Sequence, residues 1–248
     1  MRKQSQAAIV VGGGRGMGAA SARALAARGY DVALMSPSGS ARRLAADLGG
    51  IGIDGSVTEP ADLAKLVDLT LASFGRIDAV VNSTGHAPQS AGSTAPFDPD
   101  LDRSPIDIPD ADWYAGMELV LLNVVRMTRL VTPHMVKQGA GAIVNISTFA
   151  ALEPRQSFPI SSSLRLALAG YAKIYSDRYA RAGIRMNNVL PGFMENWLVD
   201  ETVLRTIPMM RTGRFDEIGK TVAFLASSDA GYITGQNILV DGGLNRHI

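Results

Sequence analysis

The sequence predicts an α/β fold in which one domain builds a doubly wound parallel sheet. Short apolar runs of strand length alternate with longer segments of helical periodicity, and a glycine-rich turn follows the first run. The 248 residues, 46% hydrophobic and 19% charged, suffice for one large domain with a buried core. No linker, repeat or low-complexity tract divides the sequence, so we expect a single domain.

The predicted elements follow one another as strand and helix in turn. The first strand is the β-branched run that begins AAIVV at residue 7. Later strands are expected at 32–35, 78–82, 142–147, 185–190 and 237–242, with a weaker candidate at 51–53. Helices are expected at 19–28, 41–48, 60–74, 110–138, 161–182 and 215–227. Such alternation is typical of parallel βαβ units, so helices should cover both faces of the sheet.

Two segments do not fit the alternation. Residues 86–110 are rich in proline and aspartate and too long for an ordinary loop of such a fold, so we expect a lid or an insertion beside a ligand site. Residues 193–210 are partly apolar and indicate a mobile substrate-covering segment, with Trp197 available to line a pocket. These two segments should determine which substrate binds.

Charge and composition exclude several classes of protein. The net charge of +1 with interspersed signs forms no basic stripe, so nucleic acid is not an expected partner. The absence of cysteine excludes disulfides and thiolate metal sites, and no metal site is predicted. No stretch has the length of a membrane span, and glycine interrupts the first apolar run too soon for a signal peptide. We expect a cytoplasmic protein that acts on a small molecule.

The glycine-rich turn, GGGRGMG at 12–18, has the sequence form of a strand, a tight turn and a helix N-terminus that holds a phosphate. Gly12 lies where the chain leaves the strand and needs unusual φ and ψ angles. Gly16 lets the backbone approach a pyrophosphate, and Gly18 lets the helix pack closely on the strand. Because glycine clusters also mark ordinary loops, the flanking strand and helix carry this interpretation.

Five motifs occur in order along the chain: the glycine turn, NSTG at 82–85, AGAIVNIS at 140–147, MNNVLPG at 186–192 and YITGQNILVDGG at 232–243. Together they resemble the short-chain dehydrogenase/reductase family over the whole chain. The resemblance implies that residues 1–248 form a single Rossmann-type domain that binds NAD or NADP.

The resemblance also bears on which dinucleotide binds. Members that prefer NAD carry an acidic side chain after the second strand, where it bonds to ribose hydroxyls and repels a 2′-phosphate, but that position here is Ser36. Arg15 matches a basic residue that NADP-preferring members use, and Ser38 could add a donor. NADP is therefore favoured over NAD. Arg42 and Arg43 are either further phosphate ligands or solvated residues of a helical turn.

Further cofactor contacts are implied by the same matches. Ser56 and Val57 fall where the family contacts adenine, and Asn82 matches a residue near the adenosine ribose. Asn196 replaces a Thr in the segment that meets the nicotinamide carboxamide, to which an amide can still bond. The expected cofactor residues are Gly12, Gly14, Arg15, Gly16, Met17, Gly18, Ser36, Ser38, Ser56, Val57, Asn82, Gly85, Arg165, Pro191, Gly192, Met194 and Asn196.

The expected reaction centre departs from the family pattern. Family members carry a Tyr and a Lys four residues apart, and the Lys lowers the pKa of the Tyr so that the phenol trades a proton with the substrate oxygen. Counting from AGAIVNIS places Ser161 at the Tyr position, Arg165 at the Lys position and Thr148 at the catalytic Ser. Counting backwards places Val120 at a helix Asn. All four positions are changed.

Each replacement has its own chemical meaning. Thr148 keeps a hydroxyl that can bind a carbonyl oxygen. Ser161 is too short to reach where a Tyr hydroxyl would lie, so a water would fill the gap, and the serines at 161–163 also suit a helix N-cap. Arg165 can bond to a ribose or clamp a carboxylate but, with a pKa above about 12, will not cycle protons.

Other titratable groups near the centre are Tyr171, Lys173 and His86. The first two fit better as a packed aromatic residue and an exposed lysine, because they lie two apart and well along the helix. His86 lies at the start of the expected lid, and its pKa allows proton transfer near neutrality. The candidate catalytic residues are therefore Thr148, Ser161, Arg165 and His86.

Three functions remain open. The first is an NADP(H)-dependent oxidoreductase acting on a small carbonyl, alcohol or imine through a non-standard proton path, in which Thr148 and water or His86 replace the Tyr. The second is a catalytically silent NAD(P)-binding protein, which the loss of all four side chains predicts. The third is a non-redox enzyme, dehalogenase-like or lyase-like, although halohydrin dehalogenases retain the Tyr and fill the nucleotide pocket.

The expected assembly also comes from the resemblance. The helices at 110–138 and 161–182 match helices that pair across a two-fold axis in the family, and the apolar C-terminal segment often completes a tetramer. We therefore expect a homotetramer or a homodimer. Leu164, Leu166, Leu168 and Tyr171 serve either that contact or the core.

Overall fold

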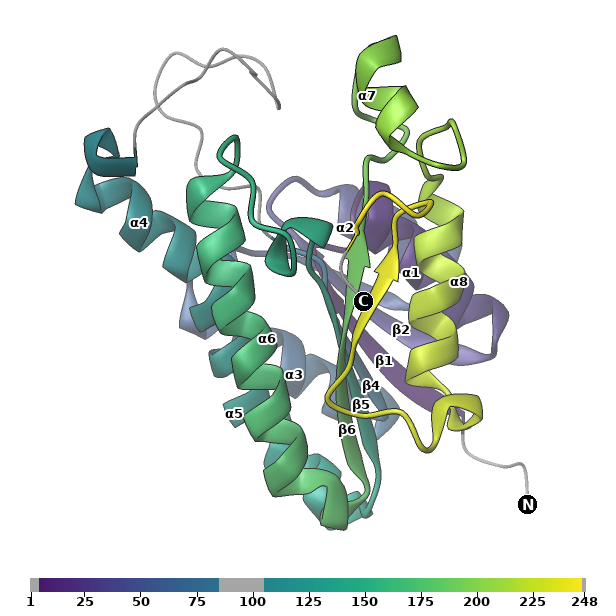
Figure 1. Ribbon diagram of the computed structural model, residues 1–248. Helices are drawn as coiled ribbons and strands as arrows, with labels where there is room; N and C mark the ends of the chain where they lie inside the picture. Colours follow the sequence, from purple (N-terminus) through teal and green to yellow (C-terminus); the bar gives the residue numbers. More distant parts are fainter. Residues whose placement is uncertain (1–4, 85–104, 247–248) are drawn as a thin grey trace.

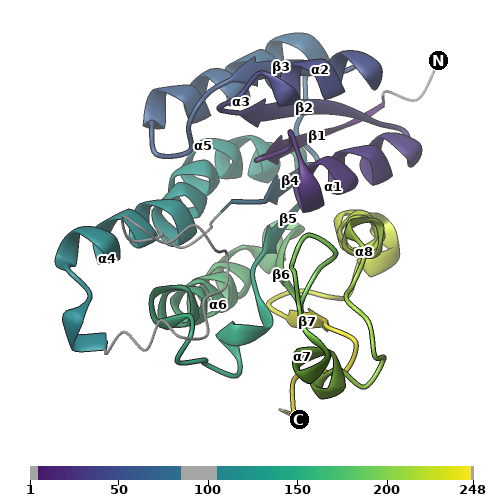
Figure 2. The ribbon, with the colours of Figure 1, turned by 90° about the horizontal axis from the view of Figure 1, so that it is seen from above.

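The computed structural model describes residues 5–84 and 105–246, which form a seven-stranded sheet with helices on both sides (Figures 1 and 2). In space the strands follow the order β3, β2, β1, β4, β5, β6, β7, and each adjacent pair is parallel. The strand order reverses between β1 and β4, so a topological switch point lies at the carboxyl ends of these strands. The predicted doubly wound α/β fold is confirmed.

The strands lie close to their predicted positions. They are β1 Gln6–Val11, β2 Tyr30–Ser36, β3 Ile51–Asp54, β4 Ala79–Asn82, β5 Gly141–Ile146, β6 Ile184–Pro191 and β7 Asn237–Val240. The weaker candidate at 51–53 is confirmed as β3. Most of the inner strand residues are apolar and buried, as expected of a parallel sheet covered on both faces.

The helices also follow the predicted order. They are α1 Gly16–Ala27, α2 Ser40–Asp47, α3 Pro60–Phe74, α4 Asp110–Met117, α5 Asn123–Gln138, α6 Pro159–Tyr179, α7 Glu201–Thr206 and α8 Phe215–Ala226. The short α7 was not expected; it begins where Asp200 Oδ1 accepts a hydrogen bond from the Val203 N–H at 2.8 Å. Within the described ranges, none of these helices combines the length and the hydropathy needed to cross a bilayer.

Two helix predictions were wrong in detail. The single helix expected at 110–138 is divided, because a π-helical turn, Glu118–Leu122, separates α4 from α5. The helix expected to begin at residue 161 begins at Pro159, with Phe158 as its N-cap. Proline suits the first helical position because its missing N–H would have no partner there. Ser161 is therefore inside the first turn and is not the N-cap.

The core has two main layers, one on each face of the sheet. Residues of α1, α2 and α8 cover one face, and residues of α3, α5 and α6 cover the other. Figure 2 shows α1 and α8 on one side of the sheet and α5 and α6 on the opposite side. The carboxyl ends of the central strands remain between these layers, where the loops that follow them can carry a site.

A row of four asparagines, three of them buried, crosses the second half of the sheet. Asn82, Asn145, Asn188 and Asn237 occupy matched positions on β4, β5, β6 and β7. Each side-chain amide donates to the side-chain oxygen on the next strand, at 2.8, 2.9 and 2.8 Å in turn. This asparagine ladder fixes the register of four strands near their carboxyl ends.

Candidate functional site

The glycine turn between β1 and α1 lies at the switch point. Gly12 has a φ of +71°, and a Cβ at Gly12 would lie 2.0 Å from the carbonyl oxygen of Ser83. A Cβ at Gly18 would lie 2.2 Å from the carbonyl oxygen of Gly12. Neither position can hold a side chain without moving backbone, since real Cβ atoms do not approach so closely. The turn is therefore pressed against the end of β4.

The N-terminus of α1 offers backbone donors to an anion. Arg15 is the N-cap residue, no side-chain cap is found within the described residues, and the first turn holds no acidic side chain. The first N–H groups of a helix lack intrahelical partners and favour negative charge. A Cβ built on Gly16 meets only the ring of Phe215, at 3.6 Å or more. This cradle fits the pyrophosphate of a dinucleotide.

Three serine hydroxyls border the turn on the side of β2. Ser40 Oγ lies 3.1 Å from Ser36 Oγ and 3.0 Å from Ser38 Oγ, and the Ala41 N–H donates to Ser36 Oγ. A Cβ at Gly14 would lie 2.1 Å from Ser40 Oγ, so the turn touches the start of α2. Sequence reasoning missed Ser40, although its spacing from Ser36 and Ser38 was a usable signal.

The arginines near these serines differ in their partners. Arg42 pairs with Asp54 at 2.8 Å, and both side chains are largely exposed. Such a surface pair is worth at most about 1 kcal/mol, but it draws the guanidinium towards β3. Arg15 and Arg43 are exposed. Arg42 therefore fits the alternative in which it is a solvated, ion-paired residue, whereas Arg15 lies within the glycine turn itself.

The expected adenine contacts lie in the turn after β3. The Ser56 N–H donates to Asp62 Oδ2 at 2.8 Å, and Ser56 Oγ lies 2.7 Å from Thr58 Oγ1, so the first turn of α3 holds this loop. Val57 is half-buried against the core. The amide of Asn82 is buried and belongs to the asparagine ladder.

The segment after β6 is fixed by contacts with the end of β7 and with Gly213. The Gly192 N–H donates to the Val240 carbonyl, and a Cβ at Gly192 would lie 2.8 Å from Asp241 Cα. Met194 is 1% exposed and forms a bridge with Gly213, whereas Asn196 is exposed. The start of the expected substrate-covering segment is thus anchored, and Pro191 is buried at the strand end.

Thr148 lies just beyond the carboxyl end of β5, and Ser161 lies at the start of α6. Thr148 caps a 3₁₀ turn at Phe149–Ala151, and its Oγ1 accepts from the Ala150 N–H at a long 3.5 Å. Ser161 occupies the first turn of α6, and both residues are half-buried. The hydroxyl proton of Thr148 is not used by this cap, so the group can donate to a substrate oxygen.

Arg165 is buried, with only 5% of the residue exposed. Its guanidinium donates to the carbonyl oxygens of Ile146 at 2.9 Å and Thr84 at 3.1 Å. Burial lowers the pKa of Arg165 to about 10, below the value expected from the sequence, yet the group stays charged near neutral pH. The Arg165 side chain therefore links the carboxyl end of β5 to the segment just after β4 through these two hydrogen bonds.

Val120, which counting along the sequence placed at a helix Asn, packs with Ile160 and Leu164 in a small apolar cluster. One helical turn later, the buried Asn123 donates from Nδ2 to Thr84 Oγ1 at 2.7 Å and to the Leu119 carbonyl. The Oδ1 atom of Asn123 has no hydrogen-bond partner among residues 5–84 and 105–246. Sequence reasoning missed Asn123, which the i, i+3 spacing from residue 120 could have indicated.

Two of the expected site residues, Gly85 and His86, lie outside the described residues, as does most of the expected lid at 86–110. The part of that segment from residue 105 onward begins with a 3₁₀ turn at Pro105–Asp107 and leads into α4. The proposed role of His86 therefore stays a prediction.

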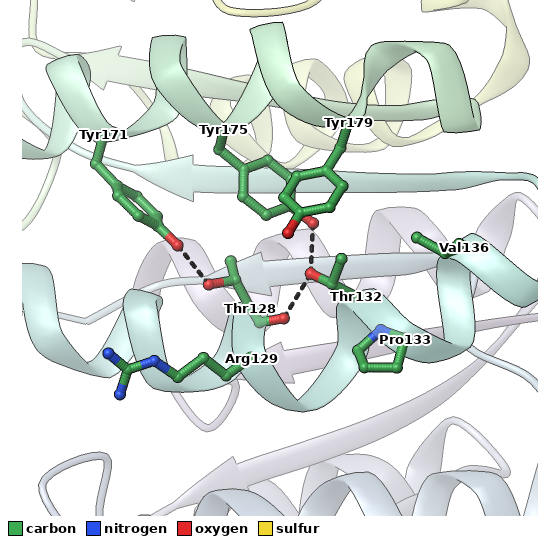
Figure 3. Close-up of a pocket in the computed structure, with 8 residues that line it drawn as sticks. All are labelled: Thr128, Arg129, Thr132, Pro133, Val136, Tyr171, Tyr175 and Tyr179. Atoms are coloured by element: carbon green, nitrogen blue, oxygen red, sulfur yellow. Dashed lines mark hydrogen bonds between the residues drawn. The ribbon is translucent and has the colours of Figure 1, made fainter.

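A separate groove of about 410 Å³ lies between α5 and α6 (Figure 3). Tyr171 and Tyr175 each place a hydroxyl 2.6 Å from a threonine of α5, Thr128 and Thr132 respectively, as Figure 3 shows. Tyr171 is a packed aromatic residue, and Lys173 is exposed and pairs with Asp177. The groove is lined by Thr128, Arg129, Thr132, Pro133, Val136, Tyr171, Tyr175 and Tyr179.

Comparison with known proteins places this architecture among reductases. Residues 11–245 match the family described as Enoyl-(Acyl carrier protein) reductase. The chain is 33% identical to a 3-oxoacyl-[acyl-carrier-protein] reductase of Synechocystis, with 97% of each protein covered. It is 32% identical to the 3-oxoacyl-[acyl-carrier-protein] reductase FabG of Escherichia coli, over 98% of this chain and 99% of the relative.

A solved structure supports the same relationship. The structure of TT0495 protein from Thermus thermophilus matches with a TM-score of 0.84 and 28% identity, covering 96% of this chain and 98% of that one. The match therefore spans the whole sheet and its helices. This chain belongs to the short-chain dehydrogenase/reductase family and is an oxidoreductase.

Proposed function

We propose that this protein is an NADP(H)-dependent oxidoreductase that acts on a small carbonyl, alcohol or imine through a proton path without a tyrosine. The observation that carries the proposal is the glycine turn at the switch point, where Gly12 and Gly18 pack without side chains beneath an uncapped helix N-terminus. A dinucleotide pyrophosphate is the ligand that such a cradle suits.

The preference for NADP over NAD is supported by the groups around the turn. The 2′-phosphate would meet the Arg15 guanidinium and the hydroxyls of Ser36, Ser38 and Ser40, which form a linked set. The last residue of β2 is Ser36 and brings no carboxylate to repel it, and the carboxylate of Asp54, which pairs with Ser36 in the sheet, is engaged by Arg42. Charge-assisted hydrogen bonds to phosphate are about twice as strong as neutral ones.

The bound cofactor would supply or accept the hydride. The chain's own contribution to the reaction is to orient the substrate oxygen, with Thr148 Oγ1 donating to it. Ser161, in the first turn of α6, would hold a water that carries the proton. Arg165 is not the proton donor, because it stays charged near neutral pH and already donates to two carbonyls. A cationic imine substrate would need only the hydride.

A catalytically silent binder is the second candidate. The burial of Val120 in an apolar cluster and the engagement of Arg165 with backbone carbonyls favour it, since neither position then supports acid–base chemistry. The two candidates share the cofactor site and differ in turnover. They are therefore separated by activity once binding has been established.

Cofactor titration is the first test. We expect purified protein to bind NADPH more tightly than NADH, and Arg15→Ala to weaken NADPH binding about tenfold or more while NADH binding changes little. Arg23→Ala, which removes an exposed arginine farther along α1, is the matched control. Equal affinity for both nucleotides, or an unchanged NADPH affinity in Arg15→Ala, would contradict the preference for NADP.

Turnover is the second test. Ketones, imines and enones are screened for NADPH oxidation at saturating cofactor, and Thr148→Ala and Thr148→Ser are compared on any substrate found. We expect Thr148→Ala to lower kcat and Thr148→Ser to retain most of it, because the serine keeps the donor. Tight NADPH binding without turnover of any class would favour the silent binder. A kcat equal to that of the wild type in both variants would remove Thr148 from the mechanism.

The proposed assembly is a homodimer, or a homotetramer built from it, in which a second copy covers the face formed by α5 and α6. Val136, Leu166 and Ile174 are exposed on these helices, and the groove between them is bordered by aromatic rings. Leu164 and Leu168 are buried instead and belong to the core. We expect Ile174→Asp to lower the mass measured by light scattering. Leu69→Asp, a change at an exposed residue of α3, should not; a monomeric wild type would refute the proposal.

A further inference from the structure

We propose that Asp241 is a positioning residue that keeps Thr148 aligned with the expected nicotinamide contacts; this inference rests on the proposed function. Asp241 is the first residue of the turn that follows β7, residues 241–246, here called the β7 turn. The β7 turn contacts the loop after β5, the loop after β6 and the substrate-covering segment. Its shape therefore bears on all three segments that are expected to border the substrate.

The Asp241 carboxylate holds the β7 turn closed. Its Oδ1 accepts a hydrogen bond from the Gly243 N–H at 3.0 Å, and its Oδ2 accepts one from the Asn245 N–H at 2.8 Å. Gly242 and Gly243 have left-handed backbone angles, with φ of +66° and +84°, so the chain bends sharply here. Hydrogen bonds to a charged acceptor are stronger than those between neutral groups. Removal of this carboxylate should therefore loosen the whole turn.

The end of the β7 turn contacts the loop that carries Thr148. Leu244 is buried and belongs with Phe149 to one apolar cluster. Asn245 Nδ2 donates to the Phe149 carbonyl at 3.3 Å, and Glu153 Oε2 accepts a backbone N–H of the turn at 3.1 Å. Because Phe149 follows Thr148 directly, a displacement of the β7 turn would also displace the proposed hydrogen-bond donor to the substrate.

The start of the β7 turn contacts the loop after β6. The Gly192 N–H donates to the Val240 carbonyl at 3.1 Å, and a Cβ at Gly192 would lie 2.8 Å from Asp241 Cα. Gly192 is one of the expected nicotinamide contacts. The backbone of Asp241 thus lies against the segment expected to meet the nicotinamide, while its side chain shapes the turn that contacts the loop after β5.

The middle of the β7 turn supports the substrate-covering segment. The Met209 N–H donates to the Gly242 carbonyl at 3.2 Å. A Cβ at Gly242 would lie 2.9 Å from Ile207 Cγ2, and a Cβ at Gly243 would lie 3.1 Å from Pro208 Cγ. Ile207 is buried in the same apolar cluster as the end of the turn. The cover of the substrate therefore rests on the same turn as the loop that carries the proposed donor.

Amide hydrogen exchange of the full chain tests the alignment without requiring turnover. The amides of residues 150–153 are hydrogen-bonded within the loop after β5. Asp241→Ala should speed their exchange about tenfold or more, because the two hydrogen bonds that close the β7 turn are lost. Exchange in β5 itself should not change. Asn245→Ala, a second variant, removes the bond to the loop and should act in the same direction.

The matched control is Ser227→Ala. Ser227 Oγ accepts the Asp229 N–H at 3.2 Å, so the control also removes a side-chain acceptor from a backbone turn. Ser227 lies between α8 and β7, before the strand rather than after it. This variant should leave exchange in residues 150–153 and the kcat unchanged.

Kinetics on a substrate found in the turnover screen test the positioning role. Asp241→Ala should lower kcat about tenfold or more, because a small displacement of a catalytic group slows the chemical step. The KM for NADPH should change less than about twofold. Asp241→Asn keeps one side-chain oxygen as an acceptor and should restore kcat in part. A purely structural role would lower the free energy of unfolding and leave the kcat of the folded protein unchanged.

The outcomes separate this inference from the proposed function. Unchanged exchange in residues 150–153 of both alanine variants, each shown to be folded by circular dichroism, overturns the inference whether or not any substrate is reduced. If Asp241→Ala does not fold, unchanged exchange in Asn245→Ala alone overturns it. Faster exchange with the kcat of the wild type also overturns it. Faster exchange in a protein that binds NADPH but reduces no substrate supports the alignment by Asp241 and refutes the reductase.

Discussion

Replacing Asn145 by leucine tests the asparagine ladder that links β4 to β7. Asn145 is fully buried, accepts from Asn82 Nδ2 at 2.8 Å and donates to Asn188 Oδ1 at 2.9 Å. Leucine has as many side-chain heavy atoms as asparagine and is bulkier, so it leaves no room for a water that could take over these bonds. The variant therefore leaves one buried donor, Asn82 Nδ2, and one buried acceptor, Asn188 Oδ1, without a partner.

The expected loss of stability follows from these two unpartnered groups. Each buried polar atom without a partner costs about 1–3 kcal/mol, so Asn145→Leu should lower the free energy of unfolding by about 2–6 kcal/mol. That is a large part of the roughly 5–15 kcal/mol that holds a typical domain together. The matched control is Asn237→Leu at the half-buried end of the ladder. This variant removes one hydrogen bond and leaves only Asn188 Nδ2 without a partner.

Urea unfolding followed by circular dichroism, at one protein concentration for all variants, measures both effects. We expect Asn145→Leu to lose at least twice as much stability as Asn237→Leu. A smaller or equal loss in Asn145→Leu would refute the reasoning, because it would mean that the ladder's central bonds contribute no more than its terminal one.

Three further predictions concern single positions. Gly12→Ala should lower stability and NADPH affinity far more than Gly29→Ala. Both glycines have a positive φ, but only a Cβ at Gly12 would meet a backbone oxygen. Similar losses in the two variants would contradict the close packing at Gly12. In Ile174→Asp, the variant expected to leave the face of α5 and α6 uncovered, Gly170→Ala should raise the free energy of unfolding by up to about 1 kcal/mol, because Gly170 lies within α6 with no described atom near its Cβ position; a loss of stability would count against this. Hydrogen bonds from Arg211 and the Arg214 N–H lower the pKa of Glu217 from 4.5 to about 2, so its stabilisation is present above pH 4.5 and is lost as the pH falls towards 2. Glu217→Gln should flatten the acid limb of the stability curve between these values, and an unchanged limb would remove this cause.

Much of the fold could be predicted from the sequence because each strand is a short apolar run with a turn at its end. Parallel strands covered on both faces need such runs, and β1 and β4 therefore stand out. The short α7 was missed because six residues are too few to show a helical period. The π turn at Glu118–Leu122 was missed because its residues keep the apolar pattern of the helices on either side.

The sequence indicated the parts of the candidate site in which the backbone geometry requires a particular residue type. It did not indicate which groups each side chain contacts. The glycines of the turn are required by close approaches, and their spacing is visible in the sequence. The partners of Arg42 and Arg165 are not visible. Arg42 pairs with Asp54 and Arg165 bonds to carbonyls of two strands, and such contacts arise only when distant segments meet in the folded chain.

The attachment of Arg165 to Ile146 and Thr84 also bears on how this chain could change in evolution. Lysine has a compact ammonium group in place of a planar fork, so it cannot reproduce the same pair of hydrogen bonds to two strand ends. A change of Arg165 to lysine would deprive a buried carbonyl of its donor, whichever residue stands at position 161. A Tyr and Lys pair at positions 161 and 165 would therefore need two changes, and the one at Arg165 would cost stability wherever it fell in the order.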